Sequence, residues 1–278
     1  MMIKTPLSRP LLGLSLVLLA SCHPVSQTTS TSLSPAPPVV NVSAQLAQQG
    51  VDGTVYQNAS AEVHRLYQQG YELARIRLDA NLARPHPLPP AVIVDIDETV
   101  LDNSPYQAAN SAKGLTYSPK TWKEWTALAK AKALPGAVDF LNYAVSKGCS
   151  VFYLSNREED EEDATVRNLV SEGFPMADAP HVMPMAGTSD KTARRVEVAK
   201  THSIVLLVGD QLTDLDESFK DRSVGEGKPH VDAMRDSLER YFIMLPNSMY
   251  GVWLNAVSGK PDSAKAGNKE RYLKAKGY

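Results

Sequence analysis

The segment from Ala91 to Asp97 constrains the fold of this chain most strongly. An unbroken apolar run, Ala91–Val94, ends abruptly at Asp95 and Asp97, two carboxylates that a single residue separates. Such a run is typical of a strand that is buried on both faces of a sheet. The C-terminal ends of these strands are where open α/β sheets bind ligands. Because buried carboxylates need a cation, a proton or several donors beside them, we expect a hard divalent cation at this point.

Strand-like and helix-like segments alternate along the rest of the chain. Helices are expected over residues 43–49, 62–78, 121–132, 136–147, 158–172 and 190–202, and further strands over 149–155, 181–185, 204–208 and 241–245. This alternation predicts βαβ units and an α/β fold, with a Rossmann-like, mostly parallel sheet and helices on both of its faces. The Lys-rich tail, residues 258–278, is expected to be an exposed extension that a helix would suit.

The helix expected before the first strand has the clearest helical periodicity. Ser60 is its expected N-cap. The prolines between residues 85 and 90 end the helix and lead into the strand with the acidic tip. The stripe that should face the core comprises Val63, Leu66, Tyr67, Leu73, Ala74 and Leu78.

The N-terminus carries the second strong signal. Lys4 and Arg9 precede a short apolar run, residues 11–19, which fits the hydrophobic region of a secretory signal and is too short to span a bilayer. The following Leu19-Ala20-Ser21-Cys22 resembles the lipobox of bacterial lipoproteins, in which the cysteine is diacylated and becomes the new N-terminus. An ordinary signal peptide that contains a cysteine is the alternative. Residues 1–22 are therefore expected to be a lipoprotein signal peptide, with Cys22 as the lipidation site.

The segment after Cys22 should tether a folded domain to a membrane. Residues 23–42 are rich in Ser, Thr, Pro and Gln, a composition that cannot bury enough apolar surface to offset the entropy of ordering. By resemblance to lipoprotein sorting, His23 rather than Asp after the cysteine favours the outer membrane of a Gram-negative bacterium. The folded domain is expected over residues 43–278.

Charge and residue spacing exclude several classes of partner. The formal net charge is −2, with no cluster of Lys and Arg that would indicate a nucleic-acid polymer. The six histidines show no metal-ligand spacing, so a zinc site is not expected. Cys149 begins an apolar run and is expected in the core, and with Cys22 lipidated no intramolecular disulfide remains. A small-molecule partner is the simplest expectation, and the oligomeric state stays open, a homodimer included.

Polar residues follow several predicted elements at points that a parallel sheet brings to one edge. The segments concerned are 95–99, 155–157, 190–191 and 209–214, which together supply carboxylates, a hydroxyl and a lysine. A metal needs oxygen ligands, and a phosphate needs a hydroxyl and a cation. A covalent mechanism needs a carboxylate nucleophile and a second carboxylate as acid and base. The set is therefore chemically coherent.

These motifs resemble those of one superfamily. The order Asp-x-Asp-x-Thr, then Ser after an apolar strand, then Lys, then Gly-Asp-x-x-x-Asp resembles the haloacid dehalogenase (HAD) superfamily. More narrowly, residues 95–106, 208–214 and 245–251 resemble the class C nonspecific acid phosphatases, which include the lipoprotein e(P4) type of outer-membrane 5'-nucleotidase. The resemblance runs from residue 62 to residue 253. It implies a HAD-like core, over 91–102 and 135–257, plus a small helical cap subdomain over about 43–84 and 103–134.

The resemblance implies roles for the carboxylates. Asp95 would be the nucleophile that forms an aspartyl-phosphate, and Asp97 would protonate the leaving oxygen and later activate water. Mg²⁺ would be held by the Asp95 carboxylate, the backbone carbonyl of Asp97 and the Asp210 carboxylate, with Asp214 as a further metal residue that orients a bound water. The alternative for Asp97 is a cap of its own loop.

The resemblance also implies two phosphate-binding residues. Ser155 would donate to the phosphoryl oxygens, and Lys191 would offset the charge of a dianionic substrate among carboxylates. The alternatives are an ordinary turn for Ser155 and a surface position for Lys191. The acidic run 158–163 begins a predicted helix, where acids are favourable, and is interpreted as a solvated face.

An aromatic-rich insertion lies between the acidic loop and residue 135. In the nucleotidases of this family, an aromatic residue from this insertion and one after the last strand clamp the base of the substrate. The matching residues here are Tyr117 and Tyr250. For Trp122 and Trp125 we favour packing of the predicted helix against the domain.

The leading interpretation is a lipid-anchored, Mg²⁺-dependent acid phosphatase that acts on 5'-nucleotides and other small phosphomonoesters, with activity rising below neutral pH. A surface lipoprotein with a ligand-binding or adhesin role on a catalytically silent scaffold is the alternative. The buried charges that the predicted strand ends would carry argue against this alternative, because a binding protein does not need buried charges that cost stability. Asp97 speaks against dehalogenation, because a halide leaving group needs no proton.

Overall fold

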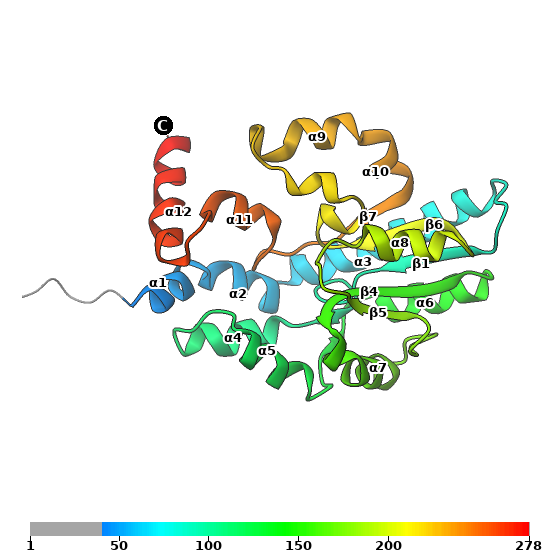
Figure 1. The fold of residues 1–278 in the computed structure, drawn as a ribbon, viewed down its shortest axis with the longest axis horizontal. Helices are drawn as coiled ribbons and strands as arrows, with labels where there is room; N and C mark the ends of the chain where they lie inside the picture. Colours follow the sequence, from blue (N-terminus) through cyan, green and yellow to red (C-terminus); the bar gives the residue numbers. More distant parts are fainter. Residues whose placement is uncertain (1–40, 278) are drawn as a thin grey trace, which may run out of the picture. The chain divides into compact units, whose positions relative to one another are not determined.

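A five-stranded parallel sheet forms the centre of the protein (Figure 1). The computed structural model describes residues 41–277, so the predicted signal peptide, Cys22 and nearly all of the predicted tether lie outside the described residues. The strand order is β5-β4-β1-β6-β7, with every pair parallel. The strands are β1 Pro90–Val94, β4 Ser150–Glu158, β5 Val182–Met185, β6 Ser203–Gly209 and β7 Phe242–Met244. The predicted α/β fold with a mostly parallel sheet is confirmed.

The first predicted strand lies in the middle of this sheet. Strand β1 pairs with β4 on one side and β6 on the other, with Val94 opposite Tyr153 and Val208. Residues 91–94 are buried. A central position buries both faces of a strand, which explains the continuous apolar run in the sequence.

Helices cover both faces of the sheet. One face carries α3 Ala61–Leu82, α6 Ala137–Ser146 and α7 Glu162–Ser171, and the other carries α8 Thr192–Ala199 and α10 Arg235–Tyr241. Side chains along a buried strand alternate between these two layers, since Val92 and Val94 pack with α3 and α6 whereas Ile93 packs with α8.

Helix α3 corrects part of the predicted stripe. Ser60 caps the helix as predicted, because its hydroxyl accepts a hydrogen bond from the Val63 N–H at 3.1 Å. Leu66 and Leu73, however, are 41% and 39% exposed. Tyr71 takes the core position instead and donates a hydrogen bond from its hydroxyl to the Thr99 carbonyl at 2.6 Å. Helix α3 therefore packs Tyr71, and not Leu66 and Leu73, against the sheet.

Two predicted helix boundaries were wrong. The helix expected to reach residue 132 is α5 Pro119–Thr126, because Ala129 has a positive φ of 50° and the chain then enters β3 Lys132–Ala133. Strand β3 pairs antiparallel with β2 Leu101–Asp102. The helix expected from residue 158 begins at Glu162, because β4 continues through Glu158.

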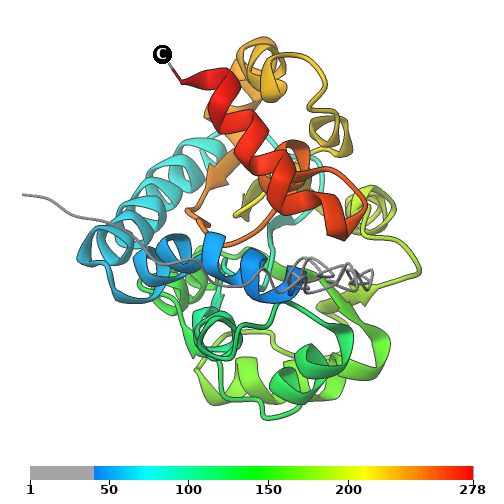
Figure 2. The ribbon, with the colours of Figure 1, turned by 90° about the vertical axis from the view of Figure 1, so that its left-hand side faces the viewer.

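Further helices lie beyond the carboxyl ends of the strands. They are α1 Val42–Gln49, α2 Val51–Ala59, α4 Ser104–Ala112, α11 Val252–Ser258 and α12 Asp262–Lys276, and α9 Lys228–Ala233 precedes α10. Helix α2 packs against α4, and the C-terminal tail forms α12, which packs against α1 and α11 (Figure 2). Within residues 41–277, no helix combines the length and the apolar character that crossing a bilayer requires.

Candidate active site

Three predicted site carboxylates meet at the carboxyl edge of the sheet. Asp95 follows β1, Asp210 follows β6, and Asp214 lies in the short turn after Asp210. All three are buried, and each offers an oxygen within 4.8 Å of the others. Gly209 makes this approach possible, because a Cβ at that position would collide with the Asp214 carboxylate. The strand ends therefore assemble the cluster that the sequence predicted.

Lys191 is the cation of this cluster. Its Nζ donates to Asp95 Oδ1, and to Asp214 Oδ1 at 2.8 Å. Burial opposes the charge of Lys191, but the carboxylates of Asp214 and Asp95 raise the pKa of its ammonium group above the usual value. The side chain is thus a buried cation and not the surface lysine of the alternative interpretation.

The cluster carries more negative charge than Lys191 offsets. Burial raises the pKa of Asp95 well above its usual value, against the opposing effect of Lys191. Burial and the Asp214 charge raise the pKa of Asp210 to about 7, although Gln211 and Asn247 each donate a hydrogen bond to its Oδ2 at 2.7 Å.

Such a set of oxygen donors fits a divalent metal. Buried carboxylates with raised pKa values bind protons when no other cation is near. A hard divalent cation can take the place of these protons and neutralise the carboxylates. Asp95, Asp210 and Asp214 are the residues whose side chains could hold the ion. Asp97 contributes no side-chain oxygen to this group, and the predicted role of its backbone carbonyl stays a prediction.

The Asp97 carboxylate is bound to a second cation, Arg157. The guanidinium donates from Nη2 to Asp97 Oδ1 at 2.7 Å and from Nε at 3.1 Å. Asn103 Nδ2 donates to the same oxygen at 2.8 Å. The Arg157 side chain is only 1% exposed, and its Nη1 donates to Thr165 Oγ1 at 3.1 Å. Oδ1 thus accepts three hydrogen bonds, whereas Oδ2 accepts only a longer one from Arg157 Nε at 3.3 Å and is the freer oxygen of Asp97.

Sequence reasoning missed Arg157 and Asn103. Arg157 stood in the predicted segment 155–157, next to Ser155, but no role was assigned to it. The signal was present, since an arginine directly after a buried apolar strand must find an anion. Asn103 is held in turn by the indole of Trp125, whose Nε1 donates to Asn103 Oδ1 at 2.7 Å.

Ser155 lies next to the site, but it does not line the cavity. The residue is 1% exposed, and its Oγ accepts a hydrogen bond from the Arg157 N–H at 3.0 Å. Its carbonyl accepts from Arg194. The neighbouring Asn156 and Arg157, by contrast, line the cavity at this edge of the sheet. The predicted contact of the Ser155 hydroxyl with a phosphate stays a prediction.

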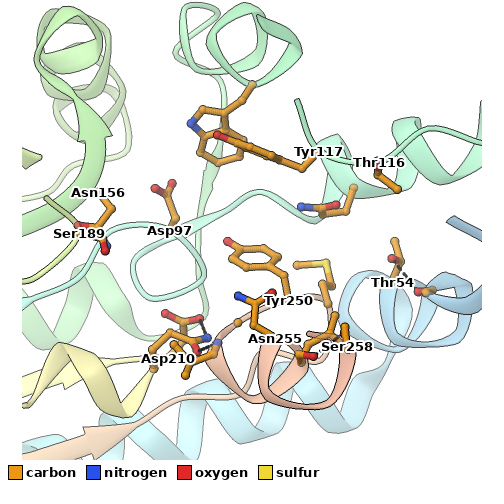
Figure 3. Close-up of a pocket in the computed structure, with 18 of the residues that line it drawn as sticks. Thr54, Asp97, Thr116, Tyr117, Asn156, Ser189, Asp210, Tyr250, Asn255 and Ser258 are labelled. Carbon is orange, nitrogen blue, oxygen red and sulfur yellow. Dashed lines mark hydrogen bonds between the residues drawn. The ribbon is translucent and has the colours of Figure 1, made fainter. Parts of the chain in front are cut away.

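A cavity of about 620 Å³ opens at this edge. Asp95, Asp97 and Asp210 line it, together with Tyr117 and Tyr250. Figure 3 shows the two tyrosines on opposite sides of the cavity, with Asp97 to one side of them. Tyr117 is 57% exposed, so its ring has one open face. The predicted pair of aromatic residues therefore borders the same space as the carboxylates.

The two tryptophans of the insertion have different surroundings. Trp125 packs against the main core, as predicted. Trp122 also lines the cavity, contacts the Tyr117 ring at 6.2 Å between centroids, and lies 5.8 Å from the Arg157 guanidinium. The interpretation of Trp122 as packing alone was therefore incomplete.

Two smaller predictions had different outcomes. Cys149 is buried as expected, and burial raises the pKa of its thiol to about 11. The acidic run is not wholly solvated, because Glu161 is buried. Its carboxylate accepts hydrogen bonds from Thr126 Oγ1 at 2.7 Å and from the Glu158 N–H at 2.9 Å. This side chain thus ties α5 to the end of β4.

A family model matches most of this chain. The model describes HAD superfamily, subfamily IIIB (Acid phosphatase), and it matches residues 18–253. Among solved structures, the class C acid phosphatase from Bacillus anthracis is 37% identical and superposes with a TM-score of 0.78, covering 84% of this chain and 99% of that one. The same relative with tungstate bound gives a TM-score of 0.79.

Two curated relatives match shorter regions. The stem 31 kDa glycoprotein of Glycine max is 31% identical over 129 residues, which are 44% of this chain and 51% of that protein. Acid phosphatase 1 of Solanum lycopersicum is 28% identical over 163 residues, 58% of each protein. The chain thus spans about half the length of these two relatives.

Proposed function

The chain belongs to the acid phosphatases of HAD superfamily subfamily IIIB, and we propose that it is a lipid-anchored, Mg²⁺-dependent enzyme that hydrolyses 5'-nucleotides and other small phosphomonoesters. The observation that carries this proposal is the buried cluster of Asp95, Asp210 and Asp214 around Lys191, at the mouth of the cavity. The tungstate-bound relative supports it, because tungstate is a tetrahedral oxyanion like phosphate.

Asp95 is the nucleophile in this proposal. One of its carboxylate oxygens forms a bond to phosphorus while the bond from phosphorus to the ester oxygen breaks, which gives an aspartyl-phosphate and an alcohol. Lys191 fixes the orientation of the carboxylate through Oδ1. Asp95, Asp210 and Asp214 would hold the metal ion, which would supply positive charge near the phosphoryl oxygens.

Asp97 is the acid and the base. Its proton passes to the departing ester oxygen, and the resulting carboxylate takes a proton from the water that cleaves the aspartyl-phosphate. Arg157 and Asn103 both donate to Oδ1, which directs the transferable proton to Oδ2. Arg157 is thus a positioning residue that acts through Asp97.

The aromatic pair supports nucleotides as substrates. A base between the rings of Tyr117 and Tyr250 would be stabilised by about 1–3 kcal/mol per stacking contact, without a requirement for one particular base. Both rings border the cavity that contains Asp95. This arrangement suits a tolerant site for 5'-nucleotides.

The place of action follows from the N-terminal sequence. The lipobox ending at Cys22 and the polar residues after it support a lipid anchor in the bacterial outer membrane. These residues lie outside the described part of the structure.

The test is phosphate release by the purified full-length chain in mild detergent at pH 5.5. The substrates are 5'-AMP, 3'-AMP, 5'-NMN and p-nitrophenyl phosphate, each with Mg²⁺ and with EDTA, beside Asp95→Asn. Asp236→Asn on α10 is the matched control, because Asp236 is exposed and does not line the cavity. We expect metal-dependent release that Asp95→Asn abolishes and a preference for 5' over 3' esters. Absence of release from every substrate would favour the silent-scaffold alternative.

A further inference from the structure

The cavity at the sheet edge has a second, basic end. Besides the carboxylates it is lined by Lys265 and Lys269, both on α12. Figure 3 shows Thr54 on the side of the cavity away from Asp97 and Asn156, with Tyr250 between the two sides. Lys265 and Lys269 are four positions apart in the sequence and therefore lie on the same side of α12.

Contacts of α12 place these lysines at the end that Thr54 marks. Gln49 Nε2, at the end of α1, donates to the Ala266 carbonyl at 3.3 Å. Asn268 Nδ2 donates to the carbonyl of Ser258, a residue of α11 that also lines the cavity. Lys265 and Lys269 flank these two anchor residues along the chain. The lysines thus enter the cavity from the wall that α1, α11 and α12 form.

Lys269 lacks compensation for its charge. Its side chain is half-buried, and among residues 41–277 it has no hydrogen bond or ion pair. Burial and the neighbouring Lys265 lower the pKa of its ammonium group. The nearest acidic residue along the helix, Glu270, is exposed and contacts Gln49 at 3.4 Å instead of Lys269. An anion at this end would offset the charge of Lys269 and reduce its repulsion from Lys265.

Other lysines of the tail behave as ordinary surface residues. Lys274 is exposed, and Lys276 pairs with Glu226 at 2.9 Å. The family match ends at residue 253, so the whole of α12 lies outside it. The two lysines of the basic end therefore lie outside the region that the family model matches.

Neutral side chains also line the cavity. They include Leu46, Ala47, Leu115, Tyr117 and Tyr250. We propose that the cavity binds phosphomonoesters that carry a second anionic group, a carboxylate or a phosphate, at the end opposite the scissile phosphate. The scissile phosphate lies at Asp95, an apolar or aromatic body fills the middle, and Lys265 and Lys269 bind the second anion. This inference rests on the proposed phosphatase function and names the class of its preferred substrates.

The test uses the full-length chain and a series of synthetic esters. Each ω-carboxyalkyl phosphate, with four to twelve carbons, is paired with its neutral amide, and an ω-phosphonoalkyl phosphate of the same length separates a preference for phosphate from one for carboxylate. The variants are Lys265→Gln, Lys269→Gln and the double substitution, with Lys274→Gln as the control on the same helix. p-Nitrophenyl phosphate, which has no second anion, monitors the chemistry.

At one chain length we expect the carboxylate ester to exceed its amide about tenfold in kcat/KM, through a lower KM. The double substitution should remove this preference, and raised salt should weaken it, because half-buried charges are screened only in part. Lys274→Gln should keep the preference, and no variant should change turnover of p-nitrophenyl phosphate.

Two results would overturn the inference. One is the absence of an anion preference at every length, and the other is a preference that survives the double substitution. Both are distinct from failure of the proposed function, which would appear as no metal-dependent hydrolysis of p-nitrophenyl phosphate by the unmodified protein.

Discussion

The two ends of the cavity hold charge in opposite ways. At the sheet edge, Lys191 is buried between Asp95, which follows β1, and Asp214, which lies in the short turn after β6. At the helical end, Lys265 and Lys269 are half-buried on one side of α12 and raise each other's electrostatic cost. The charge of Lys191 is compensated within the fold, whereas Lys269 has no hydrogen bond or ion pair among residues 41–277. Substitutions at the two ends should therefore differ in sign as well as in size.

Asp95→Asn should cause the largest change in activity. The amide removes the nucleophile, and replacements of comparable catalytic groups lower kcat by about 10⁴-fold or more. Phosphate release under saturating p-nitrophenyl phosphate measures the effect, with Asp236→Asn as the control. Retention of even a tenth of the activity in Asp95→Asn would show that another group attacks phosphorus.

Lys191→Met should cause the largest loss of stability at the sheet edge. Removal of one partner leaves buried carboxylates without their cation, which costs about 3–5 kcal/mol. The free energy of unfolding in urea, measured at pH 8 without metal, checks this value. The loss should shrink at pH 5, because Asp95 and Asp210 can then bind protons. An equal loss at both pH values would contradict the account of compensated charge.

Arg157→Gln should lower kcat by about 100-fold with little change in KM. The substitution leaves Asn103 as the remaining donor to Asp97 Oδ1, so the carboxyl group is held less firmly and its proton is directed less well to the leaving oxygen. Steady-state kinetics of 5'-AMP hydrolysis measure the split between kcat and KM. Arg157→Lys should restore only part of kcat, because lysine cannot form the two-nitrogen contact. If p-nitrophenyl phosphate, which has a good leaving group, lost as much kcat as 5'-AMP, the positioning role would be wrong.

The stability of the metal-free protein should fall as pH rises. The pKa of Asp210 is raised to about 7 in the folded state, so between its unfolded value near 4 and this value the folded state holds a proton that the unfolded state releases. Stability should therefore decrease from pH 4 to pH 7 by on the order of 3–4 kcal/mol for this group, because each pH unit between the two pKa values corresponds to about 1.4 kcal/mol, and then level off. Thermal unfolding with EDTA across this range measures the slope. Mg²⁺ should flatten it, and an unchanged slope with Mg²⁺ would argue against Asp210 as a ligand.

Lys269→Gln should have the smallest effect, of opposite sign. It removes a like-charge pair four residues apart on α12, which should stabilise the protein by about 0.2–0.5 kcal/mol at low salt. The same urea measurement that detects the loss in Lys191→Met detects this gain. Destabilisation by more than 1 kcal/mol would mean that Lys269 already has its compensation within the fold.

The sheet edge could be predicted from the sequence because short-range patterns determine it. The apolar run before Asp95 predicts a central parallel strand, and parallel strands bring their carboxyl ends together whatever their separation in the chain. Asp210 and Lys191 were found by the same rule. Helix α3 shows the limit of periodicity, since Tyr71 rather than Leu73 took the core position once the sheet had set the helix orientation.

The helical end could not be predicted in this way. The direction of α12 depends on contacts with Gln49 and Ser258, which are far away in the sequence. The composition of a Lys-rich tail also predicts a solvated segment. The Arg157–Asp97 pair was missed for a related reason, because it joins the ends of two strands through side chains whose lengths no periodicity encodes.

Calorimetric titration of Mg²⁺ into the metal-free protein at pH 7 tests the central claim most directly, because it measures the ion at the buried carboxylates without relying on catalysis. We predict one Mg²⁺ bound per chain and no binding to Asp210→Asn. Binding should also release protons, which are measured by comparing the heat of binding in buffers of different ionisation enthalpy. Equal Mg²⁺ binding by Asp210→Asn and the unmodified protein, or no binding by either, would contradict a metal centre at this edge of the sheet.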